Sequence, residues 1–410
     1  MRWTVREHYV NLLVELTSGP PIMMSKTAAY LDYQASTPLD PRVREVLFEA
    51  FSSHGNASSE EHAFGWAQAD RIGKAREAVA ALIGAEAEEI TFTGGATEAN
   101  NLGVLGAALG APAGRRRILI SGIEHKSVSE AAYAAERHGF TVEILPVGKN
   151  GIVEIVNIAD RLDDNVAVVS VMAVNNEIGT VQPVTEIGAL VRTVGAFFHV
   201  DATQAPIAID VDVGLWAADS LSLSAHKLYG PCGVGALYVA MDAPWRPQPL
   251  MFGGGHEGGL RPGTPATALC VGFGEACRIL QRDGAAERLQ LLRLRDGLRD
   301  SLARAVPQLL VTCAASPRHP GNLHVRIPGH SASDLLLRLQ PAVAASTGSA
   351  CTSGLIGPSH VALAIGLSRA EASECLRFSV GRFTTDGEIA QAGEALRAVF
   401  ESSSLAEGVT

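Results

Sequence analysis

The sequence predicts an α/β fold in which a mostly parallel sheet is flanked by helices on both sides. Apolar runs of strand length alternate with segments of helical periodicity along most of the chain. One such run, residues 166–172, is almost continuously apolar, as expected for a strand buried on both faces. The chain has 410 residues, of which 47% are hydrophobic and 19% charged. It is therefore long enough for a large core and a second, smaller domain.

The first half of the chain is predicted to form a series of β/α units. Pro41 is well placed at the start of a helix over residues 42–52, because proline suits the first helical turn. Helical spacing of apolar residues predicts a longer helix over residues 64–83, which ends at Gly84. The further strands expected are residues 29–32, 89–92, 117–120, 141–145, 166–172 and 196–201, and the further helices are residues 128–137 and 184–194.

The second half continues the alternation and leads to a smaller C-terminal α/β domain. Its expected strands are residues 234–239, 309–311, 323–327, 342–345 and 377–379. One expected helical region ends near residue 306, and two further helices are expected over residues 333–339 and 386–400. We expect residues 1–28 to be an extension outside the core and residues 29–41 to join the smaller domain. A large domain over residues 42–280 and the C-terminal domain over residues 281–410 complete this division.

A glycine-rich turn, residues 93–95, lies between the strand at 89–92 and the next helix. The exposed backbone N–H groups and the dipole of that helix favour an anion, and Thr97 can add a hydroxyl donor. A Gly-Gly pair before a helix is also common as a plain turn. The turn is therefore a candidate phosphate site that needs support from other residues.

Asp201 and Lys227 supply the two protein groups that pyridoxal phosphate requires. Asp201 ends an apolar strand, and Lys227 follows in a Ser/His/Gly-rich loop, residues 224–230. A lysine forms a Schiff base with the cofactor aldehyde, and an acid pairs with the pyridinium nitrogen. A surface lysine and a capping aspartate are the plainer alternatives.

Charge and cysteine content exclude several other classes of protein. The formal net charge of −10 argues against a general nucleic-acid-binding surface, although a local basic patch stays possible. Six cysteines lie far apart with no C-x-x-C pair, so neither a metal site of the zinc type nor a disulfide framework is predicted. A reducing, cytoplasmic compartment fits best. No stretch is long and apolar enough to cross a bilayer.

The chain resembles cysteine desulfurases of the NifS/IscS type, which are fold-type I pyridoxal-phosphate enzymes of the class-V aminotransferase family. The resemblance extends from Tyr30 to Phe400, in matching order and approximate spacing. The motifs that carry it are residues 30–33 (YLDY), 95–101 (GATEANN), 124–126 (EHK), 174–179 (VNNEIG), 199–204 (HVDATQ), 224–227 (SAHK), 348–353 (GSACTS) and 377–379 (RFS).

The resemblance implies a role for each matched residue around pyridoxal 5'-phosphate. Lys227 would form the Schiff base and shuttle a proton, Asp201 would hold the pyridine N–H, and His125 would stack on the ring and assist proton transfer. A core or capping histidine is the alternative for His125. The remaining cofactor contacts would be Asn176 and Gln204 near the ring hydroxyl, and Ala96, Thr97, Ser224 and His226 around the phosphate. Thr264 would contact the phosphate of a second subunit, which implies a homodimer with shared sites.

Arg377 and Cys351 resemble the two residues that act on the substrate. A guanidinium at Arg377 suits the carboxylate of L-cysteine, whereas its alternative is an ordinary ion pair. Asn176 would also contact the substrate. Cys351 lies among Gly, Ser, Ala and Thr, a poor place for a buried structural cysteine and a suitable place for a reactive thiolate. It would take the substrate sulfur as a persulfide and release L-alanine.

The resemblance leaves the sulfur acceptor open. Iron–sulfur cluster assembly, tRNA thiolation and DNA phosphorothioation are all compatible, each through an acceptor protein and without direct nucleic-acid binding. Gly258 stands where relatives usually carry arginine, and Cys232 stands where they carry a basic residue. The alternative enzymes are a selenocysteine lyase or another class-V aminotransferase-type enzyme. A structural partner that lacks activity is opposed by the presence of Lys227 and Cys351.

Overall fold

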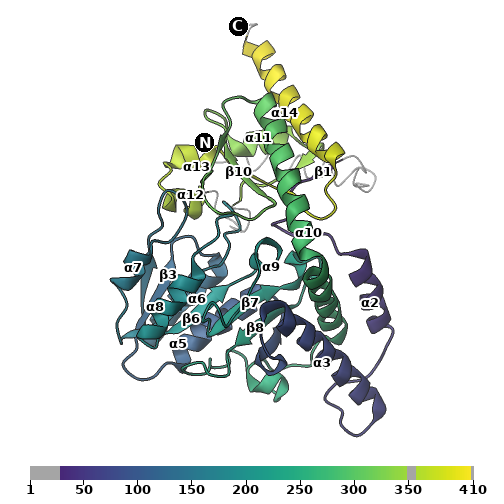
Figure 1. Cartoon of the computed structure of the whole chain (residues 1–410), viewed down its shortest axis with the longest axis vertical. Helices are drawn as coiled ribbons and strands as arrows, with labels where there is room; N and C mark the ends of the chain where they lie inside the picture. The colour runs from purple at the N-terminus through teal and green to yellow at the C-terminus, as the bar shows by residue number, and fades with distance from the viewer. Residues whose placement is uncertain (1–27, 349–356, 408–410) are drawn as a thin grey trace, which may run out of the picture.

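The computed structural model describes residues 28–348 and 357–407. Two bodies are visible in Figure 1: a large body built on a seven-stranded sheet, and a small body that carries the C-terminal elements. A single helix of 39 residues, α10 (Thr267–Ala305), runs along one side of both bodies. The predicted α/β class is confirmed.

The large sheet is mostly parallel, as predicted. Its strand order is β2-β8-β7-β6-β5-β3-β4, and only β8 runs against the other described strands. Strands β5, β6 and β7 are buried at every position, which explains why most of their residues are apolar or small. The bounds are β2 Ile90–Thr93, β3 Arg117–Ser121, β4 Thr141–Leu145, β5 Val166–Ser170, β6 Phe197–Asp201, β7 Ser220–Ser224 and β8 Gly235–Val239.

Helices cover both faces of this sheet, and successive residues of a strand pack against opposite layers. Phe197 contacts the cluster that contains residues of α5 and α6, whereas Phe198 belongs to the cluster that contains residues of α3 and α8. The helices are α2 Pro41–Phe51, α3 Ala63–Ile83, α4 Ala96–Asn101, α5 Ala107–Gly110, α6 Lys126–Ala135, α7 Ile155–Ala159, α8 Val184–Thr193 and α9 Ala205–Ala208. Short helices are η1 Ala87–Glu89, η2 Leu102–Gly106, η3 Glu136–His138, η4 Ala225–Lys227 and η5 His256–Gly259.

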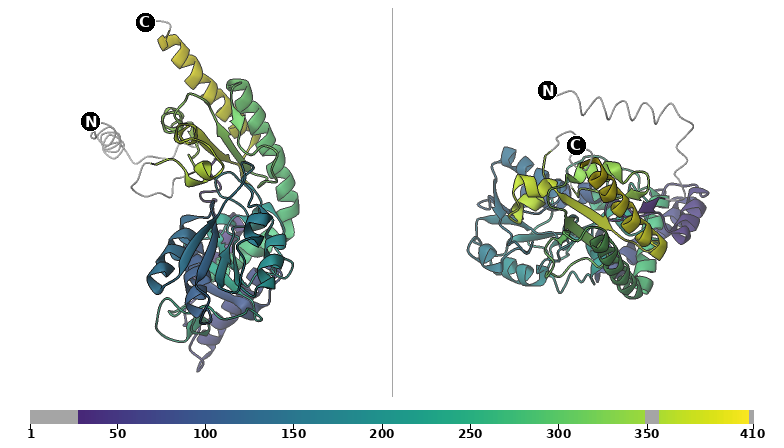
Figure 2. Two further views of the ribbon diagram at one scale, coloured as in Figure 1. Left: turned by 90° about the vertical axis from the view of Figure 1, so that its left-hand side faces the viewer. Right: turned by 90° about the horizontal axis from the view of Figure 1, so that it is seen from above.

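Among the residues that the structure describes, the small body contains two short sheets and four helices. The sheets have the orders β12-β10-β9 and β1-β11. Their strands are β1 Ala29–Tyr30, β9 Leu310–Val311, β10 Asn322–Arg326, β11 Val343–Ala344 and β12 Cys375–Ser379, and the helices are α11 Ala332–Arg338, α12 His360–Ala364, α13 Arg369–Ser373 and α14 Asp386–Glu407. Strand β1 pairs with β11, so the start of the described chain lies in this body. Helix α14 lies beside α10 (Figure 2).

Several element boundaries differ from the predicted ones for identifiable reasons. Helix α6 begins at Lys126, two residues before the predicted start, because the His125 side chain caps it by accepting from the Ser127 N–H. The predicted division near residue 280 falls inside α10, and the domain boundaries stay a prediction.

Within the described ranges, no helix combines the length and apolar character that a bilayer crossing requires.

Candidate active site

A cavity of about 710 Å³ lies at the carboxyl ends of the central strands, where open α/β sheets bind ligands. Segments from both bodies line it, since Arg377 of β12 and Gly348 belong to the small body and most of the other lining residues belong to the large body. Ten of the predicted site residues line it: Ala96, Thr97, His125, Asn176, Asp201, Gln204, Ser224, His226, Lys227 and Arg377. The structure thus brings together residues that are spread over almost 300 positions of the chain.

Two predicted site residues are not among those lining the cavity. Cys351 lies outside the described residues, although Gly348, three positions earlier, is buried and lines the cavity. Thr264 is described, but it is exposed and does not line the cavity of its own chain. The five described cysteines are free thiols, and of these only Cys232 lines the cavity.

Lys227 is the last residue of the short helix η4 and follows β7 directly. Its Nζ donates to the backbone carbonyls of Gln34 and Ala35, each at 2.7 Å. The segment that carries these carbonyls also holds the lysine loop: the Thr37 N–H donates to the His226 carbonyl at 3.0 Å. Residues near the start of the described chain therefore hold the lysine side chain within the cavity.

Asp201 ends strand β6 and is 3% exposed. One carboxylate oxygen accepts from the side-chain amide of Asn100 at 2.8 Å, and the other accepts from the backbone N–H of Thr203 at 2.9 Å. These donors stabilise the ionised carboxylate, although it is buried. Asp201 is thus a fixed negative charge in the wall of the cavity.

The opposite part of the cavity suits a phosphate group. The chain enters α4 through Gly95, whose φ of +147° strongly favours glycine, and the helix starts at Ala96 with its first N–H groups unsatisfied within the helix. Ser224 and His226 line the cavity with Thr97. Burial lowers the pKa of His226 to about 4, so its imidazole is neutral at pH 7 and has one N–H to donate. Its Nδ1 contacts the Ser36 hydroxyl at 3.1 Å.

His125 also lines this cavity. Its Nδ1 is 2.7 Å from the Ser127 hydroxyl oxygen and accepts from the Ser127 backbone N–H at 3.1 Å. Burial lowers the pKa of His125, while Asp201 acts in the opposite direction. The ring is therefore largely neutral at pH 7.

Arg377 lies at the boundary between the bodies and is 3% exposed. Its Nη2 pairs with Asp32 at 2.6 Å, and its Nη1 donates to the backbone carbonyl of Asn176 at 2.7 Å. The buried Nε has no partner among the described residues. The guanidinium is held on one side and retains N–H groups for a ligand in the cavity.

The sequence reasoning missed several residues that support this site. Asn100 was noted only as part of a motif, and Ser127 was not considered. The carbonyls of Gln34 and Ala35 leave no trace in a residue pattern, because any residue type has a carbonyl. Asp32 was also only part of a motif, and its acidic character was the one available signal for a partner of Arg377.

The residues of the cavity fit pyridoxal 5'-phosphate. A lysine amine, a buried carboxylate, and hydroxyl, imidazole and helix N-terminal donors form a donor set that matches its aldehyde, ring nitrogen and phosphate. The Thr203 hydroxyl oxygen is buried beside the cavity without a partner among the described residues, so a polar ligand atom would satisfy it.

Comparisons with known proteins agree with this geometry. A family described as Aminotransferase class-V matches residues 29–391. The chain is 42% identical over 365 residues to a protein named cysteine desulfurase IscS from Anaeromyxobacter sp. (strain Fw109-5), covering 89% of this chain and 90% of the relative. A solved structure described as a NifS-like protein superposes with a TM-score of 0.83 at 30% identity, covering 91% and 99% of the two chains. Another, SspA in complex with cysteine, gives a TM-score of 0.76 at 32% identity, covering 87% and 100%.

Proposed function

Because the chain belongs to the class-V aminotransferase family and is a cysteine desulfurase that uses pyridoxal 5'-phosphate, we propose that the cavity around Lys227 and Asp201 is its active site. The observation that carries this proposal is the meeting of a lysine amine, a buried carboxylate and a buried guanidinium in one cavity of about 710 Å³. The carboxylate comes from β6, the amine from the short helix that follows β7, and the guanidinium from β12.

Asp201 would hold the cofactor at its ring nitrogen, because its carboxylate is buried and already oriented by two donors. The backbone around Ala96, the hydroxyls of Thr97 and Ser224, and the His226 imidazole would hold the phosphate. Asn176 and Gln204 would contact the ring hydroxyl. When bound, pyridoxal 5'-phosphate supplies an electron sink that weakens the bonds at the α-carbon of an amino acid.

Arg377 would bind the carboxylate of L-cysteine through the N–H groups that it does not use for Asp32 and Asn176. The amine of Lys227 would take a proton from the substrate α-carbon, which requires that Nζ be uncharged at that step. His125, beside the same cavity, would assist the transfer of protons.

The Cys351 thiolate would act as the nucleophile towards the substrate sulfur. An S–S bond forms between Cys351 and that sulfur, while the C–S bond breaks and leaves its electron pair on the carbon, which is then protonated. The products are L-alanine and a persulfide on Cys351. The buried position of Gly348 at the cavity supports this proposal, since the chain leads from there to Cys351.

We also propose a homodimer in which Thr264 contacts the phosphate in the neighbouring subunit. The support is that Thr264 lies outside the cavity of its own chain, in a stretch, residues 251–264, that is mostly exposed. That stretch includes Phe252, which is 87% exposed. Phe252 and the adjacent Met251, which is 47% exposed, form an exposed apolar patch of the kind that another protein can cover.

The sulfur would pass to an acceptor protein in the cytoplasm. The net charge of −10 makes transfer to a protein more favourable than direct contact with nucleic acid. Iron–sulfur assembly is our first proposal for the destination, with tRNA thiolation and DNA phosphorothioation as alternatives. Purified acceptors of each class, added to enzyme that carries labelled sulfur, would identify which one removes the label.

The decisive experiment measures alanine and sulfide formed from L-cysteine in the presence of a reductant. We expect equal amounts from the wild type, almost none from Cys351→Ala, and neither product from Lys227→Ala. Cofactor binding without Cys351-dependent sulfur release would contradict the assigned role of Cys351. Release from selenocysteine but not from L-cysteine would instead indicate a selenocysteine lyase.

A further inference from the structure

A chain of buried polar side chains begins at Asn100, which lines the cavity with Asp201, and continues to His199 and Ser220, which do not line it. Asn100 and His199 are completely buried, and Ser220 is as well. The Asn100 carbonyl oxygen is 3.0 Å from His199 Nε2, and His199 Nδ1 is 2.7 Å from the Ser220 hydroxyl oxygen. The amide nitrogen of Asn100 donates to Asp201 and also to the Ser127 hydroxyl oxygen, both at 2.8 Å.

The direction of each hydrogen bond follows from the groups present. The Asp201 carboxylate only accepts, so the nitrogen of the Asn100 amide must face it, and the oxygen must face His199. His199 therefore donates from Nε2 and accepts the Ser220 hydroxyl proton at Nδ1. Burial lowers the pKa of His199 to about 4, in agreement with a neutral ring that has one N–H.

The same reasoning locates the proton of His125. The Ser127 oxygen accepts from Asn100, and its backbone N–H donates to His125 Nδ1 at 3.1 Å. Since the Ser127 oxygen accepts from Asn100, its hydroxyl proton is directed to His125 Nδ1 at 2.7 Å, and together with the backbone N–H this donor leaves Nδ1 without a proton. The proton of the neutral imidazole must then lie on Nε2.

We propose that Asn100 is a positioning residue that orients the Asp201 carboxylate and, through Ser127, keeps the ring proton of His125 on Nε2. This inference rests on the proposed function, in which Asp201 and His125 face the cofactor. One buried amide would thus orient both the carboxylate that would pair with the ring nitrogen of the cofactor and the imidazole that would assist proton transfer. With its proton on Nε2, the neutral His125 ring would act first as a proton donor at that atom.

The packing around His199 supports a fixed position for Asn100. The helix that carries Asn100 continues into the π-helical turn η2, Leu102–Gly106. A Cβ atom on Gly103 would lie 2.3 Å from His199 Nδ1, so only glycine allows the helix to approach this closely. This close approach fixes His199 against the helix that carries Asn100, and the Asn100 amide is held by hydrogen bonds to His199 on one side and Asp201 on the other.

The test uses enzyme labelled with ¹⁵N-histidine, with and without pyridoxal 5'-phosphate. Nitrogen chemical shifts distinguish a protonated from a bare ring nitrogen, and His125→Gln assigns the signals. In the cofactor-free wild type we expect His125 to have a bare Nδ1 and a protonated Nε2. In Asn100→Ala, the Ser127 hydroxyl is free to rotate and accept from Nδ1, which leaves only the Ser127 backbone N–H as a donor to that nitrogen. The Nδ1 signal should therefore move part of the way towards the protonated position.

The matched control is Asn101→Ala, because Asn101 lies on the same helix but bonds only to the Thr97 carbonyl among the described residues. The dissociation constant for pyridoxal 5'-phosphate should rise about tenfold or more in Asn100→Ala, since Asp201 loses a charge-assisted hydrogen bond. It should change little in Asn101→Ala. Nδ1 protonated in the wild type, or Asn100→Ala equal to the control in both measurements, would overturn the proposal.

The outcomes also separate this proposal from the proposed function. The histidine signals are read without cofactor, so they stay interpretable if the wild type does not bind pyridoxal 5'-phosphate, which would contradict the proposed function. If Asn100→Ala does not fold, Ser127→Ala removes only the hydroxyl between Asn100 and His125. Unchanged His125 signals in that variant would then refute the link.

Discussion

Replacing Arg377 with lysine should weaken L-cysteine binding with little effect on cofactor content. Arg377 uses one N–H of Nη1 for the Asn176 carbonyl and one of Nη2 for Asp32, which leaves Nε–H and one hydrogen on each terminal nitrogen. A carboxylate needs two parallel N–H donors, which lysine cannot provide. Each charge-assisted hydrogen bond contributes roughly 1.5–3 kcal/mol, so losing one should raise KM about 10- to 100-fold.

The assay is alanine formation at varied L-cysteine concentrations, with the cofactor content measured by absorbance. The kcat should change much less than KM, because binding of the carboxylate is similar in the ground state and the transition state. The control is Asp32→Asn, which keeps an oxygen for Arg377 but removes the charge. If Arg377 served only its ion pair with Asp32, both variants would lose the same activity. An unchanged KM in Arg377→Lys would refute the reasoning.

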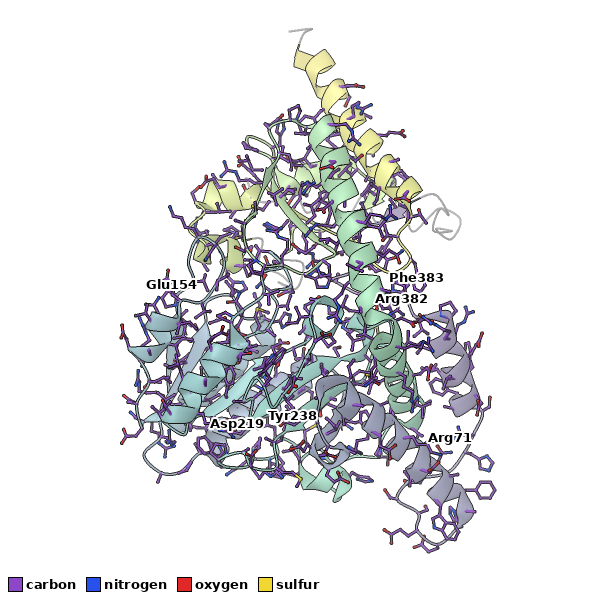
Figure 3. All side chains as sticks on the ribbon, in the orientation of Figure 1. Arg71, Glu154, Asp219, Tyr238, Arg382 and Phe383 are labelled. Carbon is purple, nitrogen blue, oxygen red and sulfur yellow. The ribbon has the colours of Figure 1, made fainter. Side chains whose placement is uncertain are left out.

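Three further predictions concern the lysine, a buried ion pair and a buried carboxyl. Lys227→Ala should lose the cofactor absorbance band and all alanine formation but keep its melting temperature within a few degrees; residual alanine formation would contradict the role of Lys227. Arg382, labelled beside Phe383 in Figure 3, pairs with Glu287 at 2.6 Å, and both side chains are largely buried. Arg382→Met should lower the free energy of unfolding, measured with denaturant, by about 3 kcal/mol, because it leaves Glu287 buried and unpaired. The double variant Arg382→Met with Glu287→Met should regain part of that free energy. Strictly additive losses in the double variant would argue against this pair. Burial raises the pKa of Glu124 from 4.5 to about 8, so the native state keeps a proton that the unfolded state loses above pH 4.5. Stability from this group is therefore full below pH 4.5 and falls as the pH rises to 8, by on the order of 4 kcal/mol. The melting temperature of Glu124→Gln, relative to wild type, should rise across this range, and a constant difference would show that Glu124 does not titrate there.

The sequence determined the architecture and most of the site because both depend on local patterns. Apolar runs such as residues 166–170 can only be buried strands, and alternation with helices requires a mostly parallel sheet. Once that sheet is assumed, residues at the carboxyl ends of strands must meet at one edge. Asp201 ends one of these strands, and the structure brings it into one cavity with His125 and Lys227.

Tertiary structure alone decided how these groups are held. Lys227 Nζ is bound by the carbonyls of Gln34 and Ala35, about 190 residues away, and a backbone carbonyl has no signature in the sequence. Arg377 pairs with Asp32 across 345 positions, from a different strand and a different end of the chain. The amide of Asn100 bonds to two segments that no periodicity connects with it. Local pattern selects which residues reach the site, whereas long-range packing selects their hydrogen-bond partners, and those partners set charge and proton position.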